Sequence, residues 1–160
     1  MSTKCDCGGR MKKATLKDFD LEPYLGLKVQ ATIVRGVRCD ACGWETIAGE
    51  EINSALHRVA GMLLRQEERL ETDRARYLRK YLGATQDELG KRMGVARKTV
   101  NQWETTGDIS PQNDLVLRAL VYAQLTTAMR PEAAVLNHVR TSPPKARPRT
   151  LVVEHLGKAA

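Results

Sequence analysis

The four cysteines of this 160-residue chain form two close pairs, and their spacing suits metal binding. Cys5 and Cys7 flank one aspartate, whereas Cys39 and Cys42 flank two residues. Zn²⁺ prefers four soft ligands in a tetrahedron, and each pair can supply one edge of it. A glycine follows the second cysteine of each pair and suits a tight turn there. The spacing predicts one structural zinc ion per chain, with free or redox-active thiols as the alternative.

Residues suited to catalysis do not gather anywhere in the sequence. A site with four thiolates is closed, so it keeps no coordination position for a catalytic water. The three histidines, His57, His138 and His155, are scattered. No Ser/His/Asp set, paired carboxylates, phosphate-binding loop or dinucleotide fingerprint occurs. We therefore expect that the protein is not an enzyme.

A second group of functional side chains lies in residues 85–104, TQDELGKRMGVARKTVNQWE. Near its end, Val100 and Trp103 share the inner side of a short helix, and Trp103 is expected in the core. Four polar side chains face the other way and are the candidate base readers: Arg97, Lys98, Asn101 and Gln102. Arg and Lys suit guanine, Asn and Gln suit adenine, and a helix fits the major groove. Thr99 is expected near a phosphate or a thymine methyl.

Local signals mark a helix and a turn before these residues. Thr85 and Glu88 stand at capping-box spacing, and Gly94 suits the left-handed position that ends a helix. Gln86 lies at the start of this helix and is expected to donate to a DNA phosphate, aided by the positive end of the helix.

The net charge of +7 and the pI of about 9.4 favour an anionic partner. Aromatic residues make up only 4% of the chain, too few for a platform that stacks single-stranded bases. Nucleic acid, as duplex DNA, is therefore the leading partner, and charge that serves only solubility is the alternative. Further basic side chains add attraction or lie on solvated helix faces: Arg76, Arg79, Lys80, Lys91 and Arg92.

The elements that position the cysteines are predicted to be strands. Residues 27–37 alternate around Val29, Ala31 and Ile33, residues 10–16 and 44–47 are candidate partner strands, and residues 18–26 form a loop. We expect a small zinc-bound β domain over residues 1–48. A unit of this size needs the metal for much of its stability.

Residues 50–71 are predicted to form one helix, which fills a linker over residues 49–71. This helix either packs on a neighbouring element or contributes to a dimer seam. Its apolar positions follow a 4-3-4 rhythm: Ile52, Leu56, Val59, Leu63 and Leu70.

Residues 72–125 are predicted to form the DNA-binding domain, with four helices. The first covers residues 71–82, with Asp73 as N-cap, Gly83 at its end and Ala75, Leu78 and Leu82 inward. Residues 105–110 form a loop, and Pro111 begins a strongly apolar last helix that carries Leu115, Leu117, Leu120 and Val121. Such domains usually bind DNA as two-fold dimers, because one helix contacts too few bases.

Residues 126–160 are predicted to hold a short helix over 131–139 and a basic, proline-rich segment over 140–149. That segment is a solvated tail or an arm that contacts a minor groove or phosphates. Residues 151–156 are too short to assign. Without an apolar run of 18 residues or a secretory signal, we expect a cytoplasmic protein with reduced cysteines and no membrane partner.

The stretches TQDELGKRMGV and RKTVNQWE resemble a helix-turn-helix of the Cro/repressor (XRE) type. A zinc-binding β domain placed before such a bundle resembles the MqsA antitoxins, with their YgiT-type zinc finger, over residues 4 to about 123. The fold class implied is mainly α, with a small N-terminal zinc-bound β domain. The first cysteine knuckle is one residue shorter than that of the family.

The resemblance implies a homodimeric repressor that binds a palindromic operator in its own promoter and neutralises a cognate ribonuclease toxin through its zinc domain. The two base-reading positions of the family fall on Lys98 and Gln102, where the family has asparagine and arginine, so the operator should differ. A stand-alone transcriptional regulator without a toxin is the alternative. A third hypothesis is an interaction protein in which the helical fold only scaffolds a partner.

Overall fold

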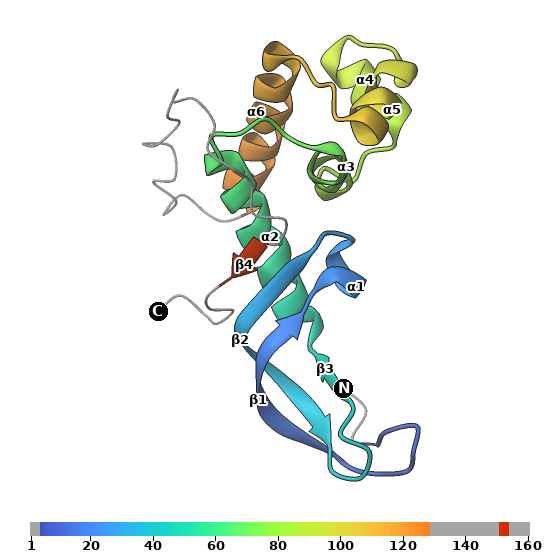
Figure 1. Ribbon diagram of the computed structural model, residues 1–160, viewed down its shortest axis with the longest axis vertical. Helices are drawn as coiled ribbons and strands as arrows, with labels where there is room; N and C mark the ends of the chain where they lie inside the picture. Colours follow the sequence, from blue (N-terminus) through green and yellow to red (C-terminus); the bar gives the residue numbers. More distant parts are fainter. Residues whose placement is uncertain (1–3, 129–150, 154–160) are drawn as a thin grey trace. The chain divides into compact units, whose positions relative to one another are not determined.

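The computed structural model describes residues 4–128 and 151–153, which belong to two compact units (Figure 1). The first, here the cysteine unit, comprises Met1–Arg58 and Arg149–Ala160. The second, the helical unit, comprises Val59–Pro148. The described residues form six helices and a small sheet, so the fold is mixed, with the strands at the N-terminal end as expected.

Three antiparallel strands build the sheet of the cysteine unit, in the order β1-β2-β3. They are β1 (Met11–Asp20), β2 (Val29–Cys39) and β3 (Glu45–Ile47), which confirms the three predicted strands. The prediction of a loop over residues 18–26 was wrong, because β1 continues to Asp20 and α1 (Glu22–Leu25) follows. Pro23 lies in the first turn of α1, where its missing N–H costs no hydrogen bond.

The alternation predicted for β2 holds only in its first half. Val29 and Ala31 are buried as expected, but Val34 is fully buried in place of Ile33, which is half-exposed. Asp18 lies across from this point on β1 and has a left-handed φ of 50°. An aspartate tolerates that conformation better than most residues, and the phase of burial changes beside it.

A fourth strand, β4 (Leu151–Val153), pairs in parallel with β2 over Val29–Ala31. Residues 151–156 are too short to assign from the sequence alone, and the pairing brings a stretch from near the end of the sequence into the cysteine unit. The helix predicted over residues 131–139 and the basic segment over 140–149 lie outside the described residues.

The long helix α2 (Gly49–Arg65) crosses the division between the two units and ends six residues before the predicted boundary at 71. Backbone oxygens in and after its last turn need donors, and the guanidinium of Arg118 supplies them. It donates to the backbone oxygens of Leu63, Leu64, Gln66 and Glu68. The chain is thereby held in a non-helical path after Arg65.

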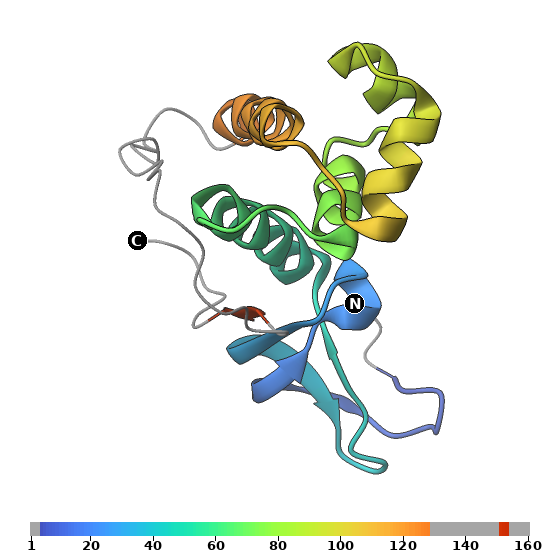
Figure 2. The same ribbon diagram turned by 45° about the horizontal axis from the view of Figure 1, so that its top comes forward.

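The helical unit continues with α3 (Thr72–Tyr81), α4 (Gln86–Met93), α5 (Arg97–Thr106) and α6 (Pro111–Ala128), which confirms the four predicted helices. α5 contacts both α3 and α4 (Figure 2). The buried apolar side chains of the helical unit include Ala75, Leu78 and Leu82, the three residues predicted to face inward from the first helix. Others are Leu89, Val100, Trp103, Ile109, Leu117 and Val121.

One detail of these helices, the N-cap of α3, differs from the prediction, and the burial pattern of α6 adds to it. Glu71, not Asp73, is the N-cap of α3, and the carboxylate of Asp73 accepts from the backbone N–H of Arg74 inside the first turn. On α6, Leu117 and Val121 are buried, whereas Leu115 is 61% exposed. The apolar character of α6 therefore extends beyond the face that packs on the core.

Candidate metal centre and candidate nucleic-acid interface

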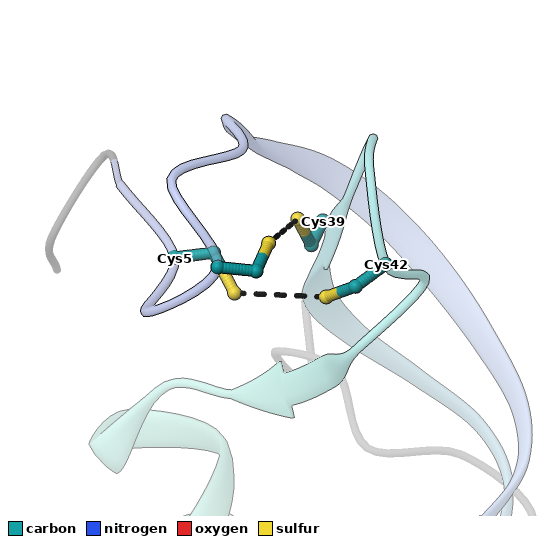
Figure 3. Close-up of side chains that lie close together, drawn as sticks. Cys5, Cys39 and Cys42 are labelled. Atoms are coloured by element: carbon teal, nitrogen blue, oxygen red, sulfur yellow. Dashed lines mark hydrogen bonds between the residues drawn. The ribbon is translucent and has the colours of Figure 1, made fainter.

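The four cysteines meet at one end of the cysteine unit, where their sulfur atoms all lie within 4.8 Å of one another. The Sγ atoms of Cys5 and Cys42 are 3.7 Å apart, and those of Cys7 and Cys39 are 3.5 Å apart (Figure 3). Each of these short distances joins one cysteine of the first pair to one of the second. The cluster therefore connects the loop before β1 to the loop between β2 and β3.

Two tight backbone turns place the sulfur atoms. The N–H of Gly8 donates to the carbonyl of Cys5, and the N–H of Gly43 donates to the carbonyl of Cys39, at 2.9 and 3.1 Å. Both glycines have a left-handed φ, 86° and 73°, as their positions in the sequence predicted. A side chain at either position would strain the turn that carries the cysteines.

The distances between the sulfur atoms fit a shared metal ion. Zinc–sulfur bonds of about 2.3 Å in a tetrahedron put the ligand atoms about 3.8 Å apart, close to the two short distances here. A disulfide requires about 2.05 Å, and all four cysteines are free. Cys5, Cys7, Cys39 and Cys42 can therefore hold a metal ion together. Among the described residues, no other group of histidines, cysteines and carboxylates is arranged for this.

The local electrostatics favour a cation at this point. Backbone N–H groups of Cys42 and Ala41 lower the pKa of Cys39 to about 7. A backbone N–H of Trp44 also lowers the pKa of Cys42, but the adjacent Cys7 and Cys39 more than offset it and raise that pKa to about 12. The pKa of Cys39 is therefore lowered while that of Cys42 is raised. A cation bound between the sulfur atoms would favour the thiolate form of its ligands.

The second site is the outer face of α5. All four predicted base-reading side chains, Arg97, Lys98, Asn101 and Gln102, are exposed there, and Thr99 is half-buried. On the inner face, Val100 and Trp103 are 1% and 2% exposed, which confirms Trp103 as a core residue. α5 is thus fixed by its apolar side while its polar side stays accessible.

The turn before α5 follows the predicted local signals. Thr85 and Glu88 form the complete capping box, and Gly94 ends α4 with a φ of 69°. Sequence reasoning missed Gly90, where a Cβ atom would lie 2.7 Å from the carbonyl oxygen of Val95. Only glycine permits the chain leading into α5 to pass this close to α4.

A buried carboxylate lies beneath α5, and the sequence analysis did not identify it. Glu104 is 3% exposed and accepts hydrogen bonds from the Nε and Nη2 atoms of Arg79 at 2.5 and 3.1 Å. Burial raises the pKa of Glu104, but the hydrogen bonds of Arg79 and Gln86 and the charges of Arg79 and Arg76 lower it more. The carboxylate is therefore ionised at neutral pH.

This ion pair corrects one prediction about the basic face of the first helix. The side chain of Arg79 is only 13% exposed, so it serves the interior and not a solvent-facing basic surface. The other basic residues predicted there are Lys80, which is exposed, and Arg76, whose side chain is 46% exposed. The Nε atom of Arg76 lies 3.6 Å from Oε2 of Glu104.

Gln86 also takes part in the network around Glu104. Its Nε2 atom donates to Oε2 of Glu104 at 3.0 Å and to Oδ1 of Asn101 at 3.3 Å. The position of Gln86 in the sequence predicts that its side chain donates to a phosphate. In this conformation both protons of the amide are used within the protein, so only the backbone N–H of Gln86 remains for that contact.

No helix in the described part of the chain is both long and apolar enough to cross a bilayer. In comparisons with known proteins, no family model, no curated protein and no solved structure matches the chain.

Proposed function

We propose that the protein is a sequence-specific DNA-binding repressor in which α4 and α5 form a helix-turn-helix and α5 is the recognition helix. One observation supports this proposal most: α5 buries Val100 and Trp103 and exposes four base-reading side chains on its other face. A helix of this kind fits the major groove, where Arg and Lys donate to guanine and amide side chains contact base edges. Thr99 lies beside them, in reach of a phosphate or a thymine methyl.

The backbone of DNA would be held by groups around this helix. The backbone N–H of Gln86, in the first turn of α4, is suited to a phosphate, and the exposed Lys80 and Arg92 add charge. One recognition helix contacts few base pairs, so we propose a homodimer on a palindromic operator with half-sites one helical turn apart. The net charge of +7 agrees with an anionic partner.

We propose Zn²⁺ as the metal of the cysteine unit, with Cys5, Cys7, Cys39 and Cys42 as its ligands. The ion would compensate the charge of the thiolates and cross-link the two loops. Elemental analysis of the purified protein should give one zinc ion per chain. Protein that carries no metal and shows four titratable thiols would overturn this assignment.

The family resemblance of the sequence supports a further role as antitoxin, in which the cysteine unit binds a small ribonuclease toxin. The unit offers an anchor for a protein partner: Trp44 follows the second cysteine knuckle directly and is 54% exposed. Exposed tryptophans are frequent hot spots of protein interfaces. If a small ribonuclease-like reading frame adjoins the gene, its co-expression with this chain should yield a complex that Trp44→Ala weakens. Without such a partner, the stand-alone regulator is the better description.

Selection from a pool of random duplexes tests the proposal on DNA binding. At about 150 mM salt, the metal-loaded chain should enrich a palindromic sequence. Binding that is confined to low salt and is equal for all sequences would instead favour a protein that only scaffolds a partner.

A further inference from the structure

The buried carboxylate beneath α5 determines which way the amide of Gln86 faces. An ionised carboxylate only accepts hydrogen bonds, and the Oε2 atom of Glu104 lies 3.0 Å from the Gln86 amide. If that amide were turned by half a rotation, its oxygen would face the carboxylate oxygen and repel it. The hydrogen-bonding partner therefore fixes the nitrogen of Gln86 on this side. Glu104 is 3% exposed and bound by Arg79, so the position of its carboxylate is fixed.

The same nitrogen then determines which way the amide of Asn101 faces. Nε2 of Gln86 has a second proton, and it lies 3.3 Å from Oδ1 of Asn101. Since a donor occupies this side, Asn101 must present its carbonyl oxygen to Gln86. The nitrogen is on the other arm of the planar amide and therefore points away from Gln86. Asn101 is exposed on α5, so this arm offers two N–H donors outward.

The orientation matters because the bases differ in their donors and acceptors. An asparagine that contacts adenine uses both its nitrogen, toward N7, and its oxygen, toward the N6 amino group. Here the oxygen already accepts from Gln86 with one of its two lone pairs, and this bond holds the amide in one orientation. Guanine presents two acceptors, O6 and N7, in the major groove, and both suit an outward NH₂ group.

We infer that Gln86 sets the base specificity of Asn101, so that this asparagine selects guanine and not the adenine usual for its type. The inference rests on the proposed function of α5 and adds to it the base that one residue selects. To contact adenine with both atoms, the oxygen of Asn101 would have to accept from the base with its second lone pair, and any rotation of the amide that this requires would weaken its bond to Gln86. The loss of one neutral hydrogen bond corresponds to roughly two- to tenfold in affinity.

The test measures affinities for four duplexes that differ at one base pair of the selected site. The position facing Asn101 is the one at which Asn101→Ala abolishes discrimination. There the unmodified protein should prefer guanine over adenine by roughly tenfold. Gln86→Ala, or Gln86→Met if the alanine variant does not fold, should reduce this preference to parity or shift it to adenine. Preferences at all other positions should stay unchanged.

Matched controls separate this effect from weaker binding in general. Lys80→Ala removes an exposed charge outside α5 and should lower the affinity for all four duplexes alike. A preference for adenine in the unmodified protein, or a preference for guanine that persists in both Gln86 variants, would overturn the inference while leaving the proposed function intact. Failure to enrich any sequence from the random pool would overturn the proposed function and the inference with it.

Discussion

The two units of this protein are stabilised in different ways. In the cysteine unit, the group that connects the two loops is a thiol cluster near the surface, and only Cys39 of its four members is buried. In the helical unit, the connecting group is the ion pair of Arg79 and Glu104, which is enclosed by the protein itself. With the proposed metal ion, the first unit would take the group that completes its cross-link from solution, whereas the ion pair of the second unit is made entirely by its own side chains.

Metal removal should have the largest effect on stability, and it should unfold the cysteine unit while the helical unit stays folded. The binding free energy of structural zinc sites is of the order of 10 kcal/mol and contributes directly to folding. After chelation, or in Cys39→Ser, we expect protease cleavage within residues 4–58 while residues 72–128 stay protected. Mass spectrometry of the fragments locates the cuts, and Asp6→Ala, an exposed change between the first two ligands, serves as the control. Equal protection of both units after complete metal loss would show that the cysteine unit does not depend on the metal for its stability.

Loss of the buried ion pair should have the next largest effect. Glu104→Ala leaves the guanidinium of Arg79 without its carboxylate partner in a largely buried position, at a cost of about 3–5 kcal/mol. Denaturant unfolding, followed by the fluorescence of the buried Trp103, measures this loss. The control is Asp87→Ala, which breaks the exposed pair with Lys91 and should cost no more than about 0.5 kcal/mol. Similar losses in both variants would show that burial of the pair is unimportant.

The same pair predicts a response to acid. The pKa of Glu104 is lowered from its ordinary value of 4.5, so the folded state binds this proton less readily than the unfolded state. The resulting stability is present above pH 4.5 and is lost as the pH falls through the pKa of the folded state. Unfolding measured over this pH range should therefore depend on pH less steeply in Glu104→Gln than in the unmodified protein. An unchanged slope would contradict the assignment.

Substitution of a single proposed base-reading residue should have a smaller effect, confined to binding. Gln102→Ala removes an exposed side chain of α5, so the free energy of unfolding should stay the same. Discrimination at one base pair of the selected site should fall by about 1–3 kcal/mol. Titration of duplexes with single substitutions measures this change. A loss of equal size on the selected and on random duplexes would show that Gln102 contacts the backbone and not a base.

Much of the helical unit was predictable because its signals are local. The capping box of Thr85 and Glu88 acts within one helical turn, and Gly94 ends α4 through its own backbone conformation. Trp103 could be assigned to the core from its spacing to Val100 alone. Likewise, the spacing of the cysteine pairs was sufficient to predict their cluster, because each pair lies in a single short loop.

The errors concern interactions between residues that are distant in the sequence. α2 ends at Arg65, where Arg118 binds backbone oxygens in and after the last turn, and a helical pattern cannot reveal a donor 50 or more residues away. The bond between Arg79 and Glu104 likewise joins two helices. β4 is only three residues long, and its pairing with β2 depends on a strand near the other end of the chain. Such partners become visible only in the folded structure.

The ratio between the affinity for the selected duplex and that for a scrambled duplex of equal length tests the central claim most directly. It is measured with the metal-loaded, full-length chain at about 150 mM salt. If α5 contacts bases in the major groove, the selected duplex should bind about 10³-fold more tightly or better. A ratio close to one, with both affinities falling equally as salt is added, would show that the protein binds only the phosphate backbone and would contradict the proposed function.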